Sequence, residues 1–198
     1  MKILNKRKGV VEKALMALLD VLVSFTKAVL SADDYRELEK KLDQVLGIEL
    51  DFENTFQDFN DQLRNGFSIP FYWEDLYSIG VCLRKIFNLL IMYYNKSLIY
   101  KNSISFKVLL NIQLELFDNI KCFFNEYLEN KKYARELLKN NRHQLKGSLR
   151  SYFDIVNIRI HDTPAFSGFY EIREVFEKII EENENIHNLM NKILIGIE

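Results

Sequence analysis

Apolar residues recur every three or four positions through most of the chain, which is the spacing of an amphipathic α-helix. Breaks in this pattern, together with loop-forming residues such as Pro70 and Pro164, divide the chain into six segments. These segments cover residues 10–30, 33–63, 74–95, 103–127, 132–159 and 172–193, to within a few residues at each end. Each segment has one apolar stripe that a neighbouring element must cover. The sequence therefore predicts an all-α protein of six long helices, packed as two tandem three-helix bundles.

The chain is predicted to form a single domain over residues 1–198. Only 7 Gly and 2 Pro occur, too few for an architecture of strands and turns, and 48% of the residues are hydrophobic, enough for a sizeable core. Residues 1–100 and 101–198 are nearly equal in length and contain three predicted helices each. We interpret these halves as pseudo-repeats.

The segment 33–63 has an unusual apolar seam. Its members are Leu38, Leu42, Val45, Phe52, Phe56, Phe59 and Leu63. Glu49 falls in the seam position between Val45 and Phe52, where an apolar residue is expected, and Glu53 follows one turn later on the same side. Two neighbouring carboxylates at a helix interface repel each other and lose hydration, so they need a cation, an arginine, a proton or water. Glu49 and Glu53 are therefore candidate site residues.

A second glutamate pair occurs in the last segment. Glu177 and Glu181 have the same spacing, although further glutamates on both sides make a solvated acidic face an equal alternative. Glu184 and His187 form an E-x-x-H motif, as in di-iron carboxylate bundles, but such sites need a second copy of the motif, which this sequence lacks. His187 is therefore interpreted as a packing or surface residue.

Charge and chemistry exclude several function classes. The net charge of -1 and the pI near 6.3 give no general basic field, so nucleic acid is not favoured as a partner. Cys82 and Cys122 lie in helical patterns without a CxxC motif, which predicts buried, reduced thiols and a cytoplasmic location. We find neither a phosphate-binding glycine loop nor a recognisable catalytic nucleophile. The sequence therefore indicates a protein that is not an enzyme and has no expected cofactor.

The N-terminal residues are basic. Lys2, Lys6, Arg7 and Lys8 precede a short apolar run, as in a secretory signal, but Asp20 interrupts the run. No stretch of about 18 uncharged apolar residues follows, so a soluble protein is expected. The basic residues are predicted to attract an acidic membrane surface or a loop of a membrane protein, with a frayed, solvated terminus as the alternative.

Two stretches resemble a known family. The stretch 66–83, GFSIPFYWEDLYSIGVCL, resembles the junction after the second helix of PhoU-like phosphate-transport regulators, in the branch associated with Pit-type phosphate permeases. The stretch 171–188 resembles the closing helix of that family. Matching residues are Phe67, Pro70, Phe71, Glu74, Asp75, Tyr77, Glu171, Ile172, Glu177, Glu181, Glu184 and Asn188. The resemblance implies six helices in two three-helix repeats, with metal-binding carboxylate clusters on the bundle surface.

The resemblance implies metal ligands at only half of the family positions. Glu49 and Glu53 match the cluster of the second helix, and Glu177 and Glu181 match that of the sixth. The acidic positions of the third helix are Arg84 and Asn88 here, and those of the fifth are Lys139 and His143. A basic residue beside retained carboxylates suggests that an ion pair has replaced the metal, with Arg84 as the partner of Glu49 and Glu53. Divalent or ferric ions at the remaining glutamates are the alternative.

The resemblance implies a non-enzymatic regulatory protein that binds a Pit-type phosphate permease or a signalling partner. On this interpretation the protein is cytoplasmic, with peripheral contact at the inner membrane face. The alternative is an unrelated helical scaffold, whose amphipathic faces serve homo-oligomerisation.

Overall fold

The protein is entirely helical in the part of the chain that the structure describes. A computed structural model describes residues 2–65, 73–100, 107–127, 129–160 and 167–196. The helices are α1 (Lys2–Leu30), α2 (Tyr35–Lys40), α3 (Leu42–Arg64), α4 (Trp73–Ile99), α5 (Lys107–Glu126), α6 (Lys131–Ile160) and α7 (Ser167–Gly196). The prediction of an all-α protein is therefore confirmed, and six of these helices are the long segments expected from the sequence.

The prediction of one helix over residues 33–63 is wrong in one respect, because the structure has two helices there. The chain turns at Lys41, which ends α2 and precedes α3. Asp34 caps α2 by accepting a hydrogen bond from the backbone N–H of Glu37 at 2.9 Å, and the carboxylate of Glu37 accepts one from the N–H of Asp33 at 2.7 Å. This reciprocal pair stabilises a short first helix. The described part of the chain thus has seven helices.

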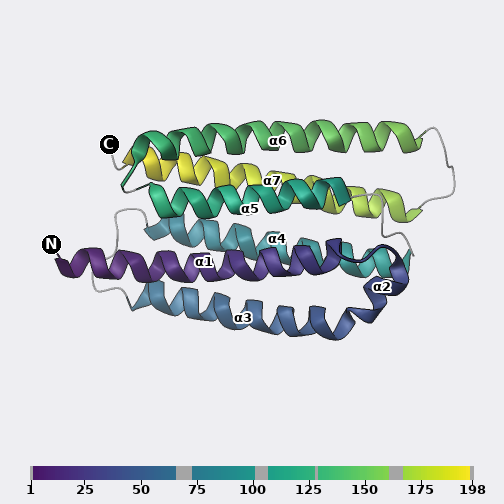
Figure 1. Cartoon of the computed structure of the whole chain (residues 1–198), viewed down its shortest axis with the longest axis horizontal. Helices are drawn as coiled ribbons and strands as arrows, with labels where there is room; N and C mark the ends of the chain where they lie inside the picture. The colour runs from purple at the N-terminus through teal and green to yellow at the C-terminus, as the bar shows by residue number, and fades with distance from the viewer. Residues whose placement is uncertain (1, 66–72, 101–106, 128, 161–166, 197–198) are drawn as a thin grey trace.

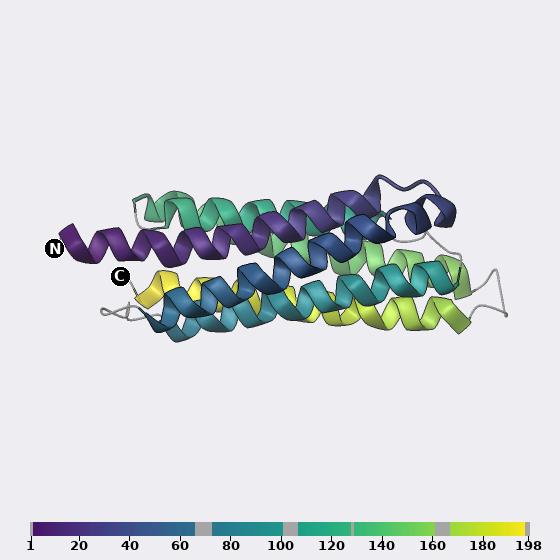
Figure 2. The ribbon, with the colours of Figure 1, turned by 90° about the horizontal axis from the view of Figure 1, so that it is seen from below.

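The long helices lie nearly side by side in an elongated bundle (Figure 1). In this view α5, α6 and α7 from the second half of the chain lie above α4, and α1 and α3 lie below it. α3 runs obliquely across one face of the bundle (Figure 2). The beginning of α1 and the end of α7 lie at the same end of the molecule.

One hydrophobic core joins the two halves of the chain. The most extensive helix pair is α4 with α7, one helix from each half, and α1 also packs against α5. Within the core, the rings of Phe52 and Phe87 stack at 4.0 Å between centroids, and Tyr93 meets Phe176 edge to face at 5.1 Å. Aromatic pairs of this kind stabilise by about 0.5–1.5 kcal/mol beyond their area burial. The arrangement as two tandem three-helix bundles therefore stays a prediction.

The predicted apolar stripes agree with the observed core in most helices. All six residues of the apolar stripe in segment 10–30 are buried in α1, and so are all six of the stripe in the last segment in α7. They are Val11, Leu15, Leu18, Leu22, Phe25 and Val29, and Ile172, Phe176, Ile179, Ile186, Met190 and Ile193. Leu42 is an exception, because the turn at Lys41 changes the phase of the helix and leaves Leu42 exposed. Cys82 is buried as expected, but Cys122 is exposed, so the prediction for Cys122 is wrong.

Candidate functional site

Glu53 and Arg84 meet between α3 and α4. Arg84 Nη2 donates a hydrogen bond to Glu53 Oε2 at 2.7 Å, and the guanidinium lies 4.7 Å from the centroid of the Phe56 ring. The arginine therefore forms an ion pair and a cation–π contact together. Each charged side chain is 44% exposed, so solvent screens the pair and its contribution to stability is about 0.2–1 kcal/mol.

Glu49 does not occupy the buried seam position that its spacing predicts. The buried residues of α3 are Val45, Phe52, Phe56 and Phe59, whereas Glu49 is half-buried. Ile48, the preceding residue, packs against the core and covers this part of α3. Among the described residues Glu49 forms no ion pair, so the predicted bridge from Arg84 to both glutamates reaches only Glu53.

The second glutamate pair lies on the exposed side of α7. Both Glu177 and Glu181 are exposed, and Glu177 accepts hydrogen bonds from Arg173, one turn earlier, at 3.1 and 3.2 Å. Lys139 and His143 are exposed on α6. Within the ranges that the structure describes, His, Cys, Asp and Glu side chains form no group of three or more that could hold a metal ion.

Charged residues also join α4 to α7, and the sequence did not indicate these contacts. Asp75 is only 8% exposed, and its carboxylate accepts a hydrogen bond from Lys192 Nζ at 2.6 Å. Lys85 Nζ donates to Glu182 at 2.8 Å. Burial, followed by the neighbouring carboxylate of Glu182, raises the pKa of the Cys82 thiol to about 12. This thiol therefore stays protonated at neutral pH and is a poor nucleophile.

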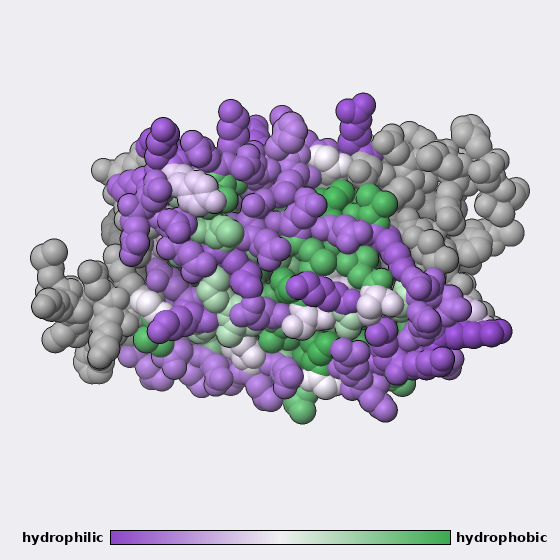
Figure 3. Space-filling view, viewed as in Figure 1, coloured by the Kyte–Doolittle hydropathy of each residue, from purple (hydrophilic) through white to green (hydrophobic). Residues whose placement is uncertain are grey.

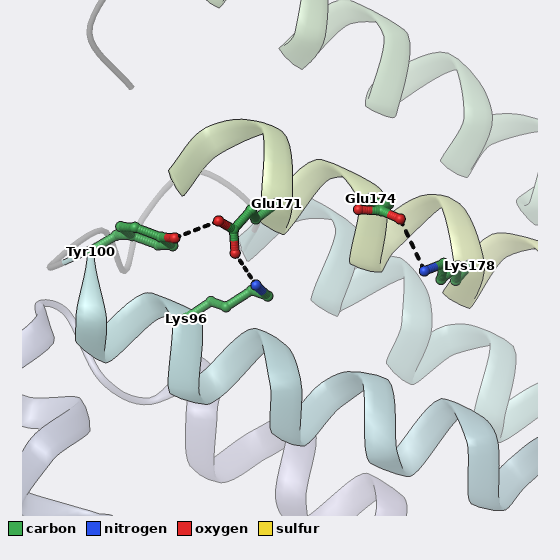
Figure 4. Close-up of polar contacts among 5 residues, drawn as sticks. All are labelled: Lys96, Tyr100, Glu171, Glu174 and Lys178. Carbon is green, nitrogen blue, oxygen red and sulfur yellow. Dashed lines mark hydrogen bonds and ion pairs between the residues drawn. The ribbon is translucent and has the colours of Figure 1, made fainter. Parts of the chain in front are cut away.

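A further cluster joins the other ends of these two helices (Figure 4). The carboxylate of Glu171 accepts hydrogen bonds from Lys96 Nζ and from the Tyr100 hydroxyl, the latter at 2.7 Å. The lysine hydrogen bond, followed by that of the tyrosine, lowers the pKa of Glu171 below its usual value. Glu171 was matched to the closing helix of the PhoU-like family, and here its side chain holds α7 to α4.

Two cavities lie between α6 and α7. One, of about 420 Å³, is lined by Arg142, Leu145, Lys146, Leu149, Glu184, His187, Asn188 and Asn191. The other, of about 360 Å³, is lined by Arg135, Leu138, Lys139, Arg142, His187, Asn191, Leu194 and Ile195. His187 is half-buried, and its Nδ1 lies 3.1 Å from Oδ1 of the buried Asn141. The predicted packing role of His187 is consistent with this contact, but His187 also lines both cavities.

The sequence motif at residues 66–83 is only partly described. Phe67, Pro70 and Phe71 lie outside the described residues, and so do the side chains of Lys2, Lys6, Arg7 and Lys8, although the backbone of these last four belongs to α1. Among the described helices, α4 is long and apolar enough to cross a membrane by length and composition. Half of the apolar window in this helix is buried inside the bundle.

No family model matches the chain, and no curated protein matches it.

Proposed function

We propose that this chain is a non-enzymatic accessory protein of phosphate transport, which binds a Pit-type phosphate permease through its helical surface. The proposal includes the PhoU-like arrangement of two tandem three-helix repeats. Its main support is the ion pair between Arg84 and Glu53, which lies where the resemblance implies a metal-binding carboxylate cluster. A guanidinium between these helices supplies the positive charge that a metal ion would otherwise supply.

The charged contacts between helices also favour a binding protein over an enzyme. Three ion pairs cross-link α4 to α7: Asp75 with Lys192, Glu182 with Lys85, and Glu171 with Lys96. These side chains link the two halves of the chain, and the thiol beside Lys85 and Glu182, that of Cys82, is a poor nucleophile because its pKa is raised to about 12. A helical bundle linked in this way is suited to presenting a helical surface to another protein.

On this proposal the protein is cytoplasmic and contacts the inner membrane face peripherally. The basic residues Lys2, Lys6, Arg7 and Lys8 would add about 1 kcal/mol each to attraction by an anionic membrane at low salt. Deletion of residues 1–8 is expected to weaken co-sedimentation with anionic vesicles. Unchanged co-sedimentation would remove the membrane contact from the proposal, while leaving permease binding open to its own test.

The deciding experiment is affinity purification of the tagged chain from membranes solubilised in mild detergent. We expect a phosphate permease to be retained, and an equally tagged unrelated helical bundle to retain none. Elemental analysis of the same sample, purified without chelators, is expected to find less than one metal ion per chain. Repeated purification without any permease would contradict the proposal.

A helical scaffold that self-associates is the second candidate, and one observation favours it. Leu42, Leu46 and Leu50 follow one another at four-residue spacing on α3, and the most exposed of them, Leu50, is 64% exposed. A surface leucine stripe of this kind is a common feature of helix pairing. Light scattering on the purified protein tests this candidate. A dimer that Leu46→Glu converts to a monomer would favour the scaffold, and a monomer at all concentrations would exclude it.

A further inference from the structure

The cavities between α6 and α7 adjoin each other and form one groove. They share Arg142, His187 and Asn191 as lining residues. We call this combined surface the α6–α7 groove. In the view of Figure 3, hydrophilic residues predominate on the surface of the described part of α6.

One wall of the α6–α7 groove is strongly basic. Residues 131–150 of α6 include seven lysines and arginines but only one acidic residue, Glu136. Arg135, Lys139, Arg142 and Lys146 follow each other at intervals of four, three and four residues, so they lie on one face of the helix. With a rise of 1.5 Å per residue, this row spans about 16 Å. The groove is therefore a local basic field on a protein whose net charge is -1.

Three of these cations have no ion-pair partner among the described side chains. In the part of the structure that is described, Lys139, Arg142 and Lys146 form no ion pair. All three are exposed; Lys139 lines one of the two adjoining cavities, Lys146 lines the other, and Arg142 lines both. Like charges held one turn apart repel each other, so an anion that bridges them relieves this repulsion.

The other wall adds neutral hydrogen-bond donors. Asn188 and Asn191 carry side-chain amides, and His187 is held in place by its contact with Asn141 at 3.1 Å. Glu184 is the single carboxylate among the residues lining the described groove, and it is exposed at one end. Guanidinium, ammonium and amide groups together form the donor set that binds phosphate-type oxygens.

The floor of the groove argues against an amphipathic helix as the ligand. Leu138, Leu145 and Leu194 are at most 5% exposed, because they already pack inside the bundle. A docked helix would gain about 25 cal/mol for each Å² of apolar surface that it covers, and these leucines offer almost none. Among the described lining residues, two apolar side chains keep exposed surface, Ile195 at 61% in one cavity and the half-buried Leu149 in the other. The attraction that the rest of the groove offers is electrostatic and directional.

We propose that the α6–α7 groove binds a small linear polyanion that carries several phosphate-type groups, of the size of tripolyphosphate. Arg142 contacts the ligand at the centre, where the two cavities meet, because it lines both. Lys146 and Lys139 bind the groups on either side, one turn away along α6. This site goes beyond the proposed function, since it does not depend on which protein the chain binds.

Calorimetric titration with sodium tripolyphosphate at low, fixed ionic strength tests the proposal. We expect saturable binding of one ligand per chain. The variant Arg142→Glu with Lys146→Glu should weaken this binding by more than about tenfold, because it replaces two charge-assisted contacts by two repulsive charges. The matched control is Lys27→Glu with Lys40→Glu, which changes the net charge equally at exposed positions away from the groove. This control should change the affinity by less than about threefold.

The neutral variant Arg142→Gln with Lys146→Gln keeps the test valid if the glutamates disturb folding, which circular dichroism would reveal. It should also weaken binding more than the control does. Absence of saturable binding, or equal weakening in the groove and control variants, would overturn the proposal. So would an acidic helical peptide that competes for the same residues with higher affinity than tripolyphosphate, because the ligand would then be a protein segment. Retention of the permease by the groove variant would leave the proposed function intact.

Discussion

Replacement of Gly80 by alanine tests a close approach between α3 and α4. Gly80 lies inside α4 and is buried, and a Cβ atom built on it would lie 2.3 Å from Cε1 of Phe59. The same Cβ would lie 2.9 Å from Cζ and 3.1 Å from Cδ1 of that ring. Phe59 is fully buried, so the ring has little free space into which it can move. The absence of a side chain at Gly80 therefore allows Phe59 to pack directly against the α4 backbone.

Two opposing effects determine the expected change in the free energy of unfolding. Alanine is favoured over glycine inside a helix by about 0.5–1 kcal/mol. Overpacking of a closed core costs about 1–3 kcal/mol. The clash exceeds the gain in helix propensity here, because a contact of 2.3 Å with a buried ring requires movement of the ring or of the backbone. We expect Gly80→Ala to destabilise the protein by about 1–2 kcal/mol.

Gly47 provides a matched control for the same substitution. It is exposed in α3, and no atom lies within 4 Å of a Cβ built there. Gly47→Ala should therefore stabilise the protein by about 0.5–1 kcal/mol. Urea titrations followed by circular dichroism at 222 nm measure both variants against the unaltered protein. Stabilisation by both alanines would refute the reasoning, because it would show that Gly80 has room for a side chain.

A double-mutant cycle with Phe59→Leu identifies the cause of the Gly80 effect. Leucine is smaller than phenylalanine at the point of contact, so Gly80→Ala should cost less in that background than in the unaltered protein. The coupling free energy between the two positions is expected to be about 1–2 kcal/mol. A coupling near zero would mean that Phe59 is not the residue that opposes the added methyl group.

Three further predictions concern the seam of α3, the ion pair and the groove histidine. Phe56→Ala should lower the free energy of unfolding by about 3–5 kcal/mol in a denaturant titration, since a buried aromatic side chain leaves a cavity; a loss below about 1 kcal/mol would contradict its core position. Arg84→Ala should cost only about 0.5–1.5 kcal/mol, because its ion pair with Glu53 is partly exposed, whereas Arg84→Asp should raise metal uptake in elemental analysis. Stoichiometric iron, zinc or nickel in the unaltered protein would count against the ion-pair interpretation. Burial, followed by the charge of Arg142, lowers the pKa of His187 below its usual value. The unfolded chain therefore binds the proton more readily, so stability should fall as the pH falls through about 6.5 and below. His187→Gln should remove this part of the pH dependence in thermal melts, and an unchanged pH profile would show that His187 does not cause it.

The sequence by itself determined the helices and most of their buried faces. Helical periodicity is a local property, because hydrogen bonds within a helix link residues four apart and a stripe at that spacing needs no knowledge of the partner. The stripes of α1 and α7 were predictable for this reason. The pairing of Arg84 with Glu53 was expected through the resemblance to the PhoU-like family, which also implied a pairing with Glu49 that the described residues do not show.

Glu49 shows where this reasoning reaches its limit. The spacing of Glu49 from the apolar residues of α3 gives only its angle around the helix. The width of the buried face depends on which side chains pack against it. Ile48 packs against the core, so Glu49 remains half-buried. The turn at Lys41 was missed because it contains neither glycine nor proline, the residues that usually mark a break.

Only the tertiary structure decided which helices pair across the two halves of the chain. α4 packs most extensively against α7, and this contact joins Asp75 to Lys192 across 117 positions of the sequence. The packing of α6 against α7 brings the basic row of α6 beside His187 to form the groove. An apolar stripe indicates that a helix needs a partner, but several helices here present similar stripes. The partner is selected by side-chain packing over the whole core, which is a property of the folded chain and not of any one segment.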